Sequence, residues 1–275
     1  MRNLSIGLIA ALISTTALAE RIIDTIHSVS PGDDGEEHLV YLENGRVVFI
    51  DPEIYHADEF VPGTRTKFII DNKNRVKDID TLEELRAAPP EIIEKMPLEE
   101  SPTVLSSYAE AQSIFRFMNQ NYYNRSECTD RAHVWSYEEW RRHGLISRKV
   151  FMFFTNTYIR RYNYGWWFHV SPYTLVQNGD SVTEYVMDRR FNSSPRTMKS
   201  WSDGFIHSRK ECPVTTYHNY RANNNGPEHC YHVKSHMYNR LPLHVEYEER
   251  GSKPKTQFST SEVNFSYRAF SRREL

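Results

Sequence analysis

Three side chains of the types that thiol hydrolases use lie in separate stretches of this 275-residue chain. Cys128 opens a sequence typical of a helix N-terminus, where unpaired backbone N–H groups and the helix dipole favour a thiolate. His169 lies in an aromatic, strand-like stretch, and Asp188 ends the next such stretch. A thiolate attacks carbonyl carbon, a histidine transfers its proton, and a carboxylate orients the histidine. We therefore predict a triad of Cys128, His169 and Asp188, with the helix-start N–H groups holding the oxyanion.

Two helices are expected around the cysteine. Ser126, with acidic residues in the next turn, predicts the cap of a helix that runs from about Cys128 to Arg142 and is stopped by Gly144. Apolar residues at helical spacing predict another helix over 107–119. Cys128 is thereby expected in the first turn of its helix.

Strand patterns follow the second helix. Aromatic and β-branched runs at 149–154, 166–170 and 182–188 predict consecutive strands of an antiparallel sheet. Adjacent strands of this kind would bring His169 and Asp188 to the sheet edge that faces the helix start. Two later runs, 243–247 and 263–267, are expected to add edge strands.

The N-terminal part has a different character. Short apolar runs with turn residues over 20–80 predict a small β domain, and Asn44-Gly45 between two such runs is a strong hairpin signal. Prolines among glutamates over 81–103 predict a linker. Residues 104–275 would then form the catalytic domain, giving an α+β fold overall.

Residues 1–19 predict a secretory signal peptide. A cationic start is followed by an apolar stretch over 4–18 and by Ala17-Leu18-Ala19, a small-x-small cleavage site. The apolar stretch is too short to span a bilayer comfortably. We expect a mature chain that begins at Glu20 and is exported to the periplasm or beyond, with no membrane span.

Charge is unevenly distributed, although the whole chain carries only −2. Residues 20–103 hold 9 Lys and Arg against 20 Asp and Glu, a net of −11, whereas 104–275 hold 24 against 16, a net of +8. The two parts could therefore attract each other. Basic runs are too short to indicate a nucleic-acid partner.

The three cysteines allow three pairings. Cys212 and Cys230 flank a polar, Asn-rich loop, and closing a loop of that size would stabilise the fold by about 3 kcal/mol. An exported protein favours such a bond. This context favours a Cys212–Cys230 disulfide and leaves Cys128 as the free thiol.

Several ordered motifs resemble the protein-glutaminase family. They are the sequence that opens at Cys128 and continues through His133, the run at 149–151, the run at 166–170 and the run at 185–188. The resemblance spans roughly 104–235 and implies a papain-like or transglutaminase-like core with Cys128 as nucleophile, His169 as base and acid, and Asp188 as its orienting partner. It further implies deamidation of glutamine in proteins or peptides, with no metal or organic cofactor. Arg189 and the pair Ser171-Pro172 depart from the family pattern, which leaves substrate preference open.

The resemblance also suggests a role for the acidic N-terminal part. Glutaminases of this family are made with a pro-region that covers the active-site cleft. Residues 20–103, at a net charge of −11, would suit such a cover for a basic catalytic domain. A permanent accessory domain is the equal alternative.

Other activities stay open beside this interpretation. A cysteine peptidase or a transglutaminase could use the same core, and a secreted binding protein could carry an inert Cys128. A zinc site is a further alternative, because His232 and His236 are one helical turn apart and could share a metal, beside His229 and Cys230.

Overall fold

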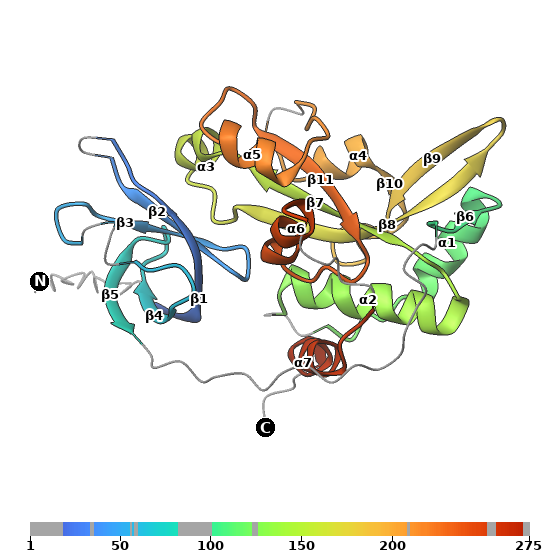
Figure 1. The fold of residues 1–275 in the computed structure, drawn as a ribbon, viewed down its shortest axis with the longest axis horizontal. Helices are drawn as coiled ribbons and strands as arrows, with labels where there is room; N and C mark the ends of the chain where they lie inside the picture. The colour runs from blue at the N-terminus through green and yellow to red at the C-terminus, as the bar shows by residue number, and fades with distance from the viewer. Residues whose placement is uncertain are drawn as a thin grey trace, which may run out of the picture.

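The computed structural model describes residues 19–33, 36–55, 57, 60–81, 101–122, 126–207, 210–251 and 257–271. They form an α+β fold, in which a small β domain precedes a larger domain of helices packed on an antiparallel sheet (Figure 1). The predicted fold class is confirmed. Residues 1–18 of the predicted signal peptide and 82–100 of the predicted linker lie outside the described residues.

The β domain is a five-stranded antiparallel sheet in the order β3-β2-β1-β4-β5. The backbone N–H of Phe49 donates to the carbonyl oxygen of Asn74 at 2.9 Å, so the two ends of this order approach each other. The sheet is therefore curled around its own apolar core. Its strands are β1 (Glu20–Ser30), β2 (His38–Leu42), β3 (Val47–Ile50), β4 (Arg65–Ile70) and β5 (Val76–Thr81).

The hairpin between β2 and β3 turns at Asn44-Gly45, as predicted. Gly45 has a φ of +92°, a conformation that favours glycine. A Cβ atom at this position would lie 3.1 Å from the Phe168 ring and 3.2 Å from the Phe168 carbonyl oxygen. Glycine therefore lets this turn approach the backbone of the larger domain closely.

The larger domain has a central sheet in the order β10-β9-β8-β7-β11. β7 pairs antiparallel with β8, and β8 with β9, which confirms the predicted succession of strands. β6 (Val104–Leu105) pairs with β8 in parallel. The other strands are β7 (Arg148–Phe154), β8 (Phe168–Asn178), β9 (Ser181–Val186), β10 (Arg196–Thr197) and β11 (Cys230–His236).

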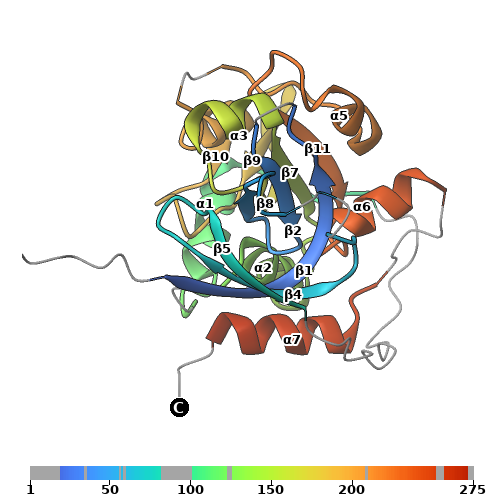
Figure 2. The ribbon, with the colours of Figure 1, turned by 90° about the vertical axis from the view of Figure 1, so that its left-hand side faces the viewer.

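Helix α2 (Cys128–His143) packs along one face of this sheet, and α7 (Thr260–Ser271) packs on α2 (Figures 1 and 2). α2 ends as predicted, because Gly144 adopts the left-handed conformation and its N–H bonds back to Trp140. No described helix is long and apolar enough to cross a membrane. The remaining helices are α1 (Tyr108–Phe117), α3 (Asn156–Tyr162), α4 (Met198–Ser202), α5 (Tyr217–Asn223) and α6 (Pro242–Glu249).

Two sequence predictions are wrong in this part of the chain. The runs 243–247 and 263–267 are not edge strands but lie within helices α6 and α7. Pro242 begins α6, a position where its missing N–H is harmless. In α7, Val263, Ser266 and Phe270 are buried at helical spacing.

Besides the β domain's own core, one hydrophobic cluster spans both domains. Leu39, Tyr41, Val47 and Phe49 of the β domain belong to the same buried cluster as the β7 and β8 side chains. The contact between the domains therefore resembles a protein interior rather than a wetted surface.

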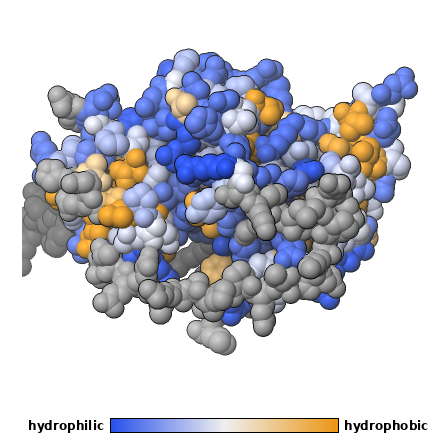
Figure 3. Space-filling model, viewed as in Figure 1, coloured by the Kyte–Doolittle hydropathy of each residue, from blue (hydrophilic) through white to orange (hydrophobic). Residues whose placement is uncertain are grey.

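The surface seen in Figure 3 is mainly hydrophilic, with apolar residues gathered over the β domain and near the β8–β9 hairpin.

Candidate active site

Cys128 is the first residue of α2, and its side chain is buried, with 1% exposed. The position before it, the helix cap, is Glu127, which makes no side-chain capping bond. Ser126 was predicted to be the cap, and this prediction is wrong. The backbone of Val170 on β8 hydrogen-bonds to the thiol, so the helix start meets the strand that carries His169.

His169 and Asp188 are brought together by adjacent strands. His169 Nε2 lies 2.7 Å from Asp188 Oδ2, and both side chains are buried. Asp188 follows β9 by two residues, and the N–H of Met187 still bonds to Pro172 of β8 at 2.8 Å. This register places the carboxylate beside the imidazole, as the strand pattern predicted.

The electrostatics of Asp188 favour the carboxylate. Burial alone would raise its pKa, but the charge and hydrogen bond of His169 oppose this effect. A hydrogen bond from Trp201 and the charge of Arg131 add to the opposition, and the pKa of Asp188 is lowered below its ordinary value. Asp188 is therefore ionised at neutral pH.

The thiol of Cys128 is in the opposite situation. Burial raises its pKa to about 12, Arg131 acts to lower it, and Glu127 acts to raise it further. The thiolate that the helix start would favour is therefore disfavoured in this structure.

Arg131 is a charged member of the site to which sequence patterns assigned no role. It lies one turn after Cys128, is buried, and its Nη1 donates to the carbonyl oxygen of Ser126 and, at 3.2 Å, to Ser126 Oγ. It therefore holds the segment that enters α2. Its i+3 spacing from the cysteine is the only signal of this position in the sequence.

Aromatic rings enclose the imidazole of His169. Between ring centroids, Phe205 lies 4.6 Å from it, Trp201 5.6 Å, and Phe191 5.3 Å with the two ring planes nearly perpendicular. Trp201 Nε1 also donates to Asp188 Oδ2 at 2.9 Å. No sequence pattern indicated these three residues, since they come from segments without a clear strand or helix period.

The β domain lies over the start of α2. A cleft of about 710 Å³ separates the N-terminal strand from the helix start and the segments around His169 and Asp188. Its β-domain side is formed by 19–23, Asn44 and Arg46, and its other side by Ser126, Glu127, Arg131, Trp166, Arg190 and Phe191.

The β2–β3 hairpin binds the backbone that leads into His169. Trp167 N–H donates to the Gly45 carbonyl at 2.8 Å, and Val47 N–H donates to the Gly165 carbonyl at 3.0 Å. The Trp167 indole donates to the Leu42 carbonyl at 2.8 Å. The hairpin therefore occupies the backbone groups beside the candidate site.

Side chains reinforce this contact. His27 of β1 stacks on Trp167 at 4.5 Å, and its Nε2 lies 2.8 Å from the Tyr217 hydroxyl. The Tyr41 hydroxyl donates to Asn156 Oδ1. The predicted contact of the N-terminal domain with the larger domain is thus present in the structure.

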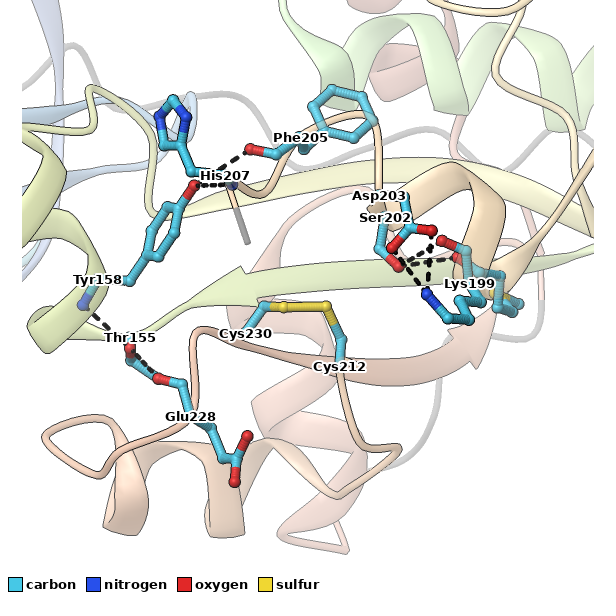
Figure 4. The surroundings of a disulfide bond; sticks show 11 residues. Thr155, Tyr158, Lys199, Ser202, Asp203, Phe205, His207, Cys212, Glu228 and Cys230 are labelled. Atoms are coloured by element: carbon cyan, nitrogen blue, oxygen red, sulfur yellow. Dashed lines mark hydrogen bonds and ion pairs between the residues drawn. A yellow bond between two sulfur atoms is a disulfide. The ribbon is translucent and has the colours of Figure 1, made fainter. Parts of the chain in front are cut away.

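The disulfide joins Cys212 and Cys230, with Cα atoms 4.9 Å apart (Figure 4). Cys128 is the free cysteine. The predicted pairing is therefore confirmed, and a disulfide of this kind is typical of exported proteins.

The arrangement removes the basis of the zinc alternative. His232 and His236 lie on strand β11, where four residues span about 13 Å, and not on one helical turn. Cys230 is committed to the disulfide. Within the part of the chain that the structure describes, no three His, Cys, Asp or Glu side chains are grouped to hold a metal ion.

Residues 105–205, which carry all three predicted triad positions, match the family model described as glutaminase. The likeness to glutaminases at the level of sequence therefore lies in this stretch. The recognition from sequence motifs is thereby confirmed. No curated protein matches the chain.

Solved structures extend the likeness to the glutaminase fold as a whole. A crystal structure of pro-protein-glutaminase superposes with a TM-score of 0.51 at 12% identity, covering 93% of this chain and 96% of that one. A mutant of pro-protein-glutaminase gives 0.50 at 13% identity, covering 82% and 85%. At these identities the likeness concerns the fold alone, and it includes the small β domain.

Proposed function

We propose that the chain is a glutamine amidohydrolase of the protein-glutaminase type, with Cys128 as nucleophile, His169 as base and acid, and Asp188 as orienting carboxylate. The glutaminase family match and the fold support a glutamine-deamidating enzyme. The observation that carries the assignment of residues is the His169–Asp188 bond of 2.7 Å, next to the strand backbone that bonds to the Cys128 thiol.

The chemistry follows from this arrangement. His169 takes the thiol proton, and Cys128 sulfur bonds to the carboxamide carbon of glutamine. His169 returns the proton to the leaving nitrogen, so that ammonia departs and a thioester remains. Water then gives a proton to His169 and its oxygen to the thioester carbon, which releases glutamate and regenerates the thiol. These steps require neither a metal nor an organic cofactor.

The tautomer of His169 matters for these steps. Nε2 is bonded to Asp188, so Nδ1 is the nitrogen that would exchange the proton with Cys128. Asp188 stabilises the imidazolium that forms, without taking its proton. Asp188 thus acts on the reaction through His169.

We further propose that residues 20–103 keep the site closed until the linker is cut. The support is the burial of Cys128, with its pKa raised to about 12, and the β2–β3 hairpin bonded to 165–167. The two similar structures are both described as pro-protein-glutaminase. A signal peptide over 1–19 would export the chain before this cleavage, to the periplasm or beyond.

Ammonia release from a glutamine-containing protein and from a blocked glutamine dipeptide tests the proposal. Three samples are compared: the chain from Glu20, the same chain cut within 82–100, and Cys128→Ala treated identically. We expect release from the cut chain and none from Cys128→Ala.

Each other outcome has a definite meaning. Equal release from the intact and cut chains would make the β domain a permanent accessory domain. Peptide-bond cleavage, or transfer of an added amine in place of water, would assign the same core to a peptidase or a transglutaminase. Ammonia release that survives in Cys128→Ala would overturn the cysteine mechanism.

A further inference from the structure

Trp201 shares a single carboxylate oxygen with the candidate catalytic histidine. Its indole Nε1 donates to Asp188 Oδ2 at 2.9 Å, while His169 Nε2 lies 2.7 Å from the same atom. Trp201 and Asp188 are each 1% exposed. Because the site is buried, water does not readily replace either donor.

We propose that Trp201 is a positioning residue of the reaction: its indole N–H holds Asp188 in the orientation that makes His169 present Nδ1 to Cys128. This inference rests on the proposed function, because it assigns Trp201 a part in the same triad. Trp201 does not touch the reacting atoms, and it acts through Asp188.

The geometry gives the indole two tasks. A hydrogen bond to the charged form of a carboxylate favours that form, and this bond is one of the causes that lower the pKa of Asp188. Two donors on one oxygen also fix the plane of the carboxylate, and with it the direction of the bond to His169. The indole ring further limits the imidazole, since the two rings lie 5.6 Å apart with planes only 33° from parallel.

A second imidazole also lies near Trp201. The ring of His232 is 5.9 Å from the indole, with planes 31° from parallel, so the indole contacts two imidazoles. Burial lowers the pKa of His232 to about 4, so His232 is neutral at neutral pH. His232 therefore adds no second positive charge when His169 becomes charged during the reaction.

The segment after α4 is tied down at two points (Figure 4). The Tyr158 hydroxyl donates to the Phe205 carbonyl at 3.3 Å and accepts from the His207 N–H at 3.1 Å. The Cys212–Cys230 disulfide anchors the chain a few residues later. These ties hold the loop that follows the helix carrying Trp201, and they give the disulfide a place in the construction of the site.

Trp201→Phe tests the inference, with Trp135→Phe as the matched control. Trp135 is likewise 1% exposed, and its indole donates to the Asn119 carbonyl at 2.8 Å, but it lies in the interior of α2. Both variants therefore lose one indole hydrogen bond and similar buried area. Only Trp201→Phe should affect Asp188.

The first readout uses the intact chain labelled with ¹⁵N-histidine. NMR reports which imidazole nitrogen of His169 carries the proton, and the Nε2–H resonance reports its bond to Asp188. We expect Trp201→Phe to shift this resonance and to mix the two tautomers, and Trp135→Phe to leave both unchanged.

The second readout is ammonia release under the conditions in which the wild type is active. We expect kcat to fall by about 10- to 100-fold with KM little changed, as when an outer partner of a functional group is lost. The acid limb of the pH profile should move upward, because losing a donor raises the pKa of the carboxyl.

An isosteric variant keeps the test decisive even if Trp201→Phe does not fold. β-(3-Benzothienyl)alanine at position 201 retains the bicyclic shape and removes the N–H. If this variant keeps the wild-type histidine resonances and pH profile, Trp201 only fills space and the inference is overturned. Absence of ammonia release from the cut wild type would instead reject the proposed function, and the NMR comparison would still decide the hydrogen-bond role.

Discussion

A half-buried glutamate, Glu127, and a buried one, Glu139, lie toward the opposite ends of helix α2, and desolvation raises the pKa of each carboxyl to about 8. Glu127, just before the helix, faces the β domain, where the charge of Asp24 raises its pKa further. Glu139, in the second half of the helix, faces Ser147 and Lys149 of its own domain, and both act to lower its pKa. The pKa of about 8 therefore arises at the contact between the domains for Glu127 and within the core of the larger domain for Glu139.

The difference shows which part of the fold controls each end of the helix. At the start of α2, burial is partly supplied by the β domain, and Cys128 lies in that environment. At the other end, the described residues around Glu139 belong to the larger domain. Changes at the helix start should therefore alter chemistry and domain contact, and changes at the far end should alter stability only.

The largest expected effect is at Asp188, the candidate active-site carboxylate. Asp188→Asn keeps the shape of the side chain but removes the charge that orients His169, so kcat should fall by about 10³- to 10⁴-fold. Ammonia release under wild-type conditions measures this loss. Asp203→Asn is the control, because Asp203 pairs with Lys199 on the exposed side of α4 and should keep full activity. An Asp188→Asn variant with wild-type kcat would remove Asp188 from the triad.

Glu139→Gln should have the opposite profile, with stability changed and activity kept. Its pKa in the folded chain is about 8, above the ordinary value of 4.5, so its contribution to stability is present below about pH 4.5 and is lost as pH rises through 8. The free energy of unfolding of the variant should exceed that of the wild type by about 2–4 kcal/mol at pH 8 and should equal it near pH 4.5.

Urea unfolding at both pH values measures this difference. Glu211→Gln, at an exposed position, is the control and should follow the wild type at each pH. If Glu139→Gln is no more stable than the wild type at pH 8, the Glu139 carboxyl is not held neutral in the core. The proposed difference between the two ends of α2 would then be wrong.

Much of this helix and of its sheet was predictable from local patterns. Gly144 marks the end of α2 because a left-handed residue stops a helix, and Asn44-Gly45 marks the hairpin for a similar reason. His169 and Asp188 lie in runs with clear strand character, so their proximity followed from simple antiparallel pairing.

Other parts depended on contacts that no local pattern contains. A five-residue run such as 243–247 fits both a strand period and a helix period, and its environment made it helix α6. Trp201 reaches Asp188 from a five-residue helix whose following loop is held by Tyr158 and the disulfide. The burial that raises the pKa of Cys128 likewise depends on how the chain folds around it.

The smallest expected effect tests the domain contact itself. Asp24 and Glu127 are both half-buried, and desolvation raises their pKa values to about 6 and about 8. The stability that each neutral carboxyl contributes to the fold is therefore lost as pH rises through its pKa. Asp24→Asn removes one of these ionisations and the charge that raises the pKa of Glu127. The slope of unfolding free energy against pH between 4 and 8 should therefore flatten, by about 1 kcal/mol over the range.

The slope of unfolding free energy against pH decides this test, rather than the stability at one pH. The side-chain amide of Asp24→Asn can accept only one of the two backbone hydrogen bonds that the carboxylate accepts from Thr25 and Asn44, and this loss lowers stability equally at every pH. Asp78→Asn is the control, since Asp78 accepts a backbone N–H on the exposed side of β5. Asp24→Asn should flatten this slope by the same amount in the Glu139→Gln background as in the wild type, because the two ends of α2 are independent. A slope unchanged by Asp24→Asn would mean that the β domain does not control the environment in which Cys128 lies.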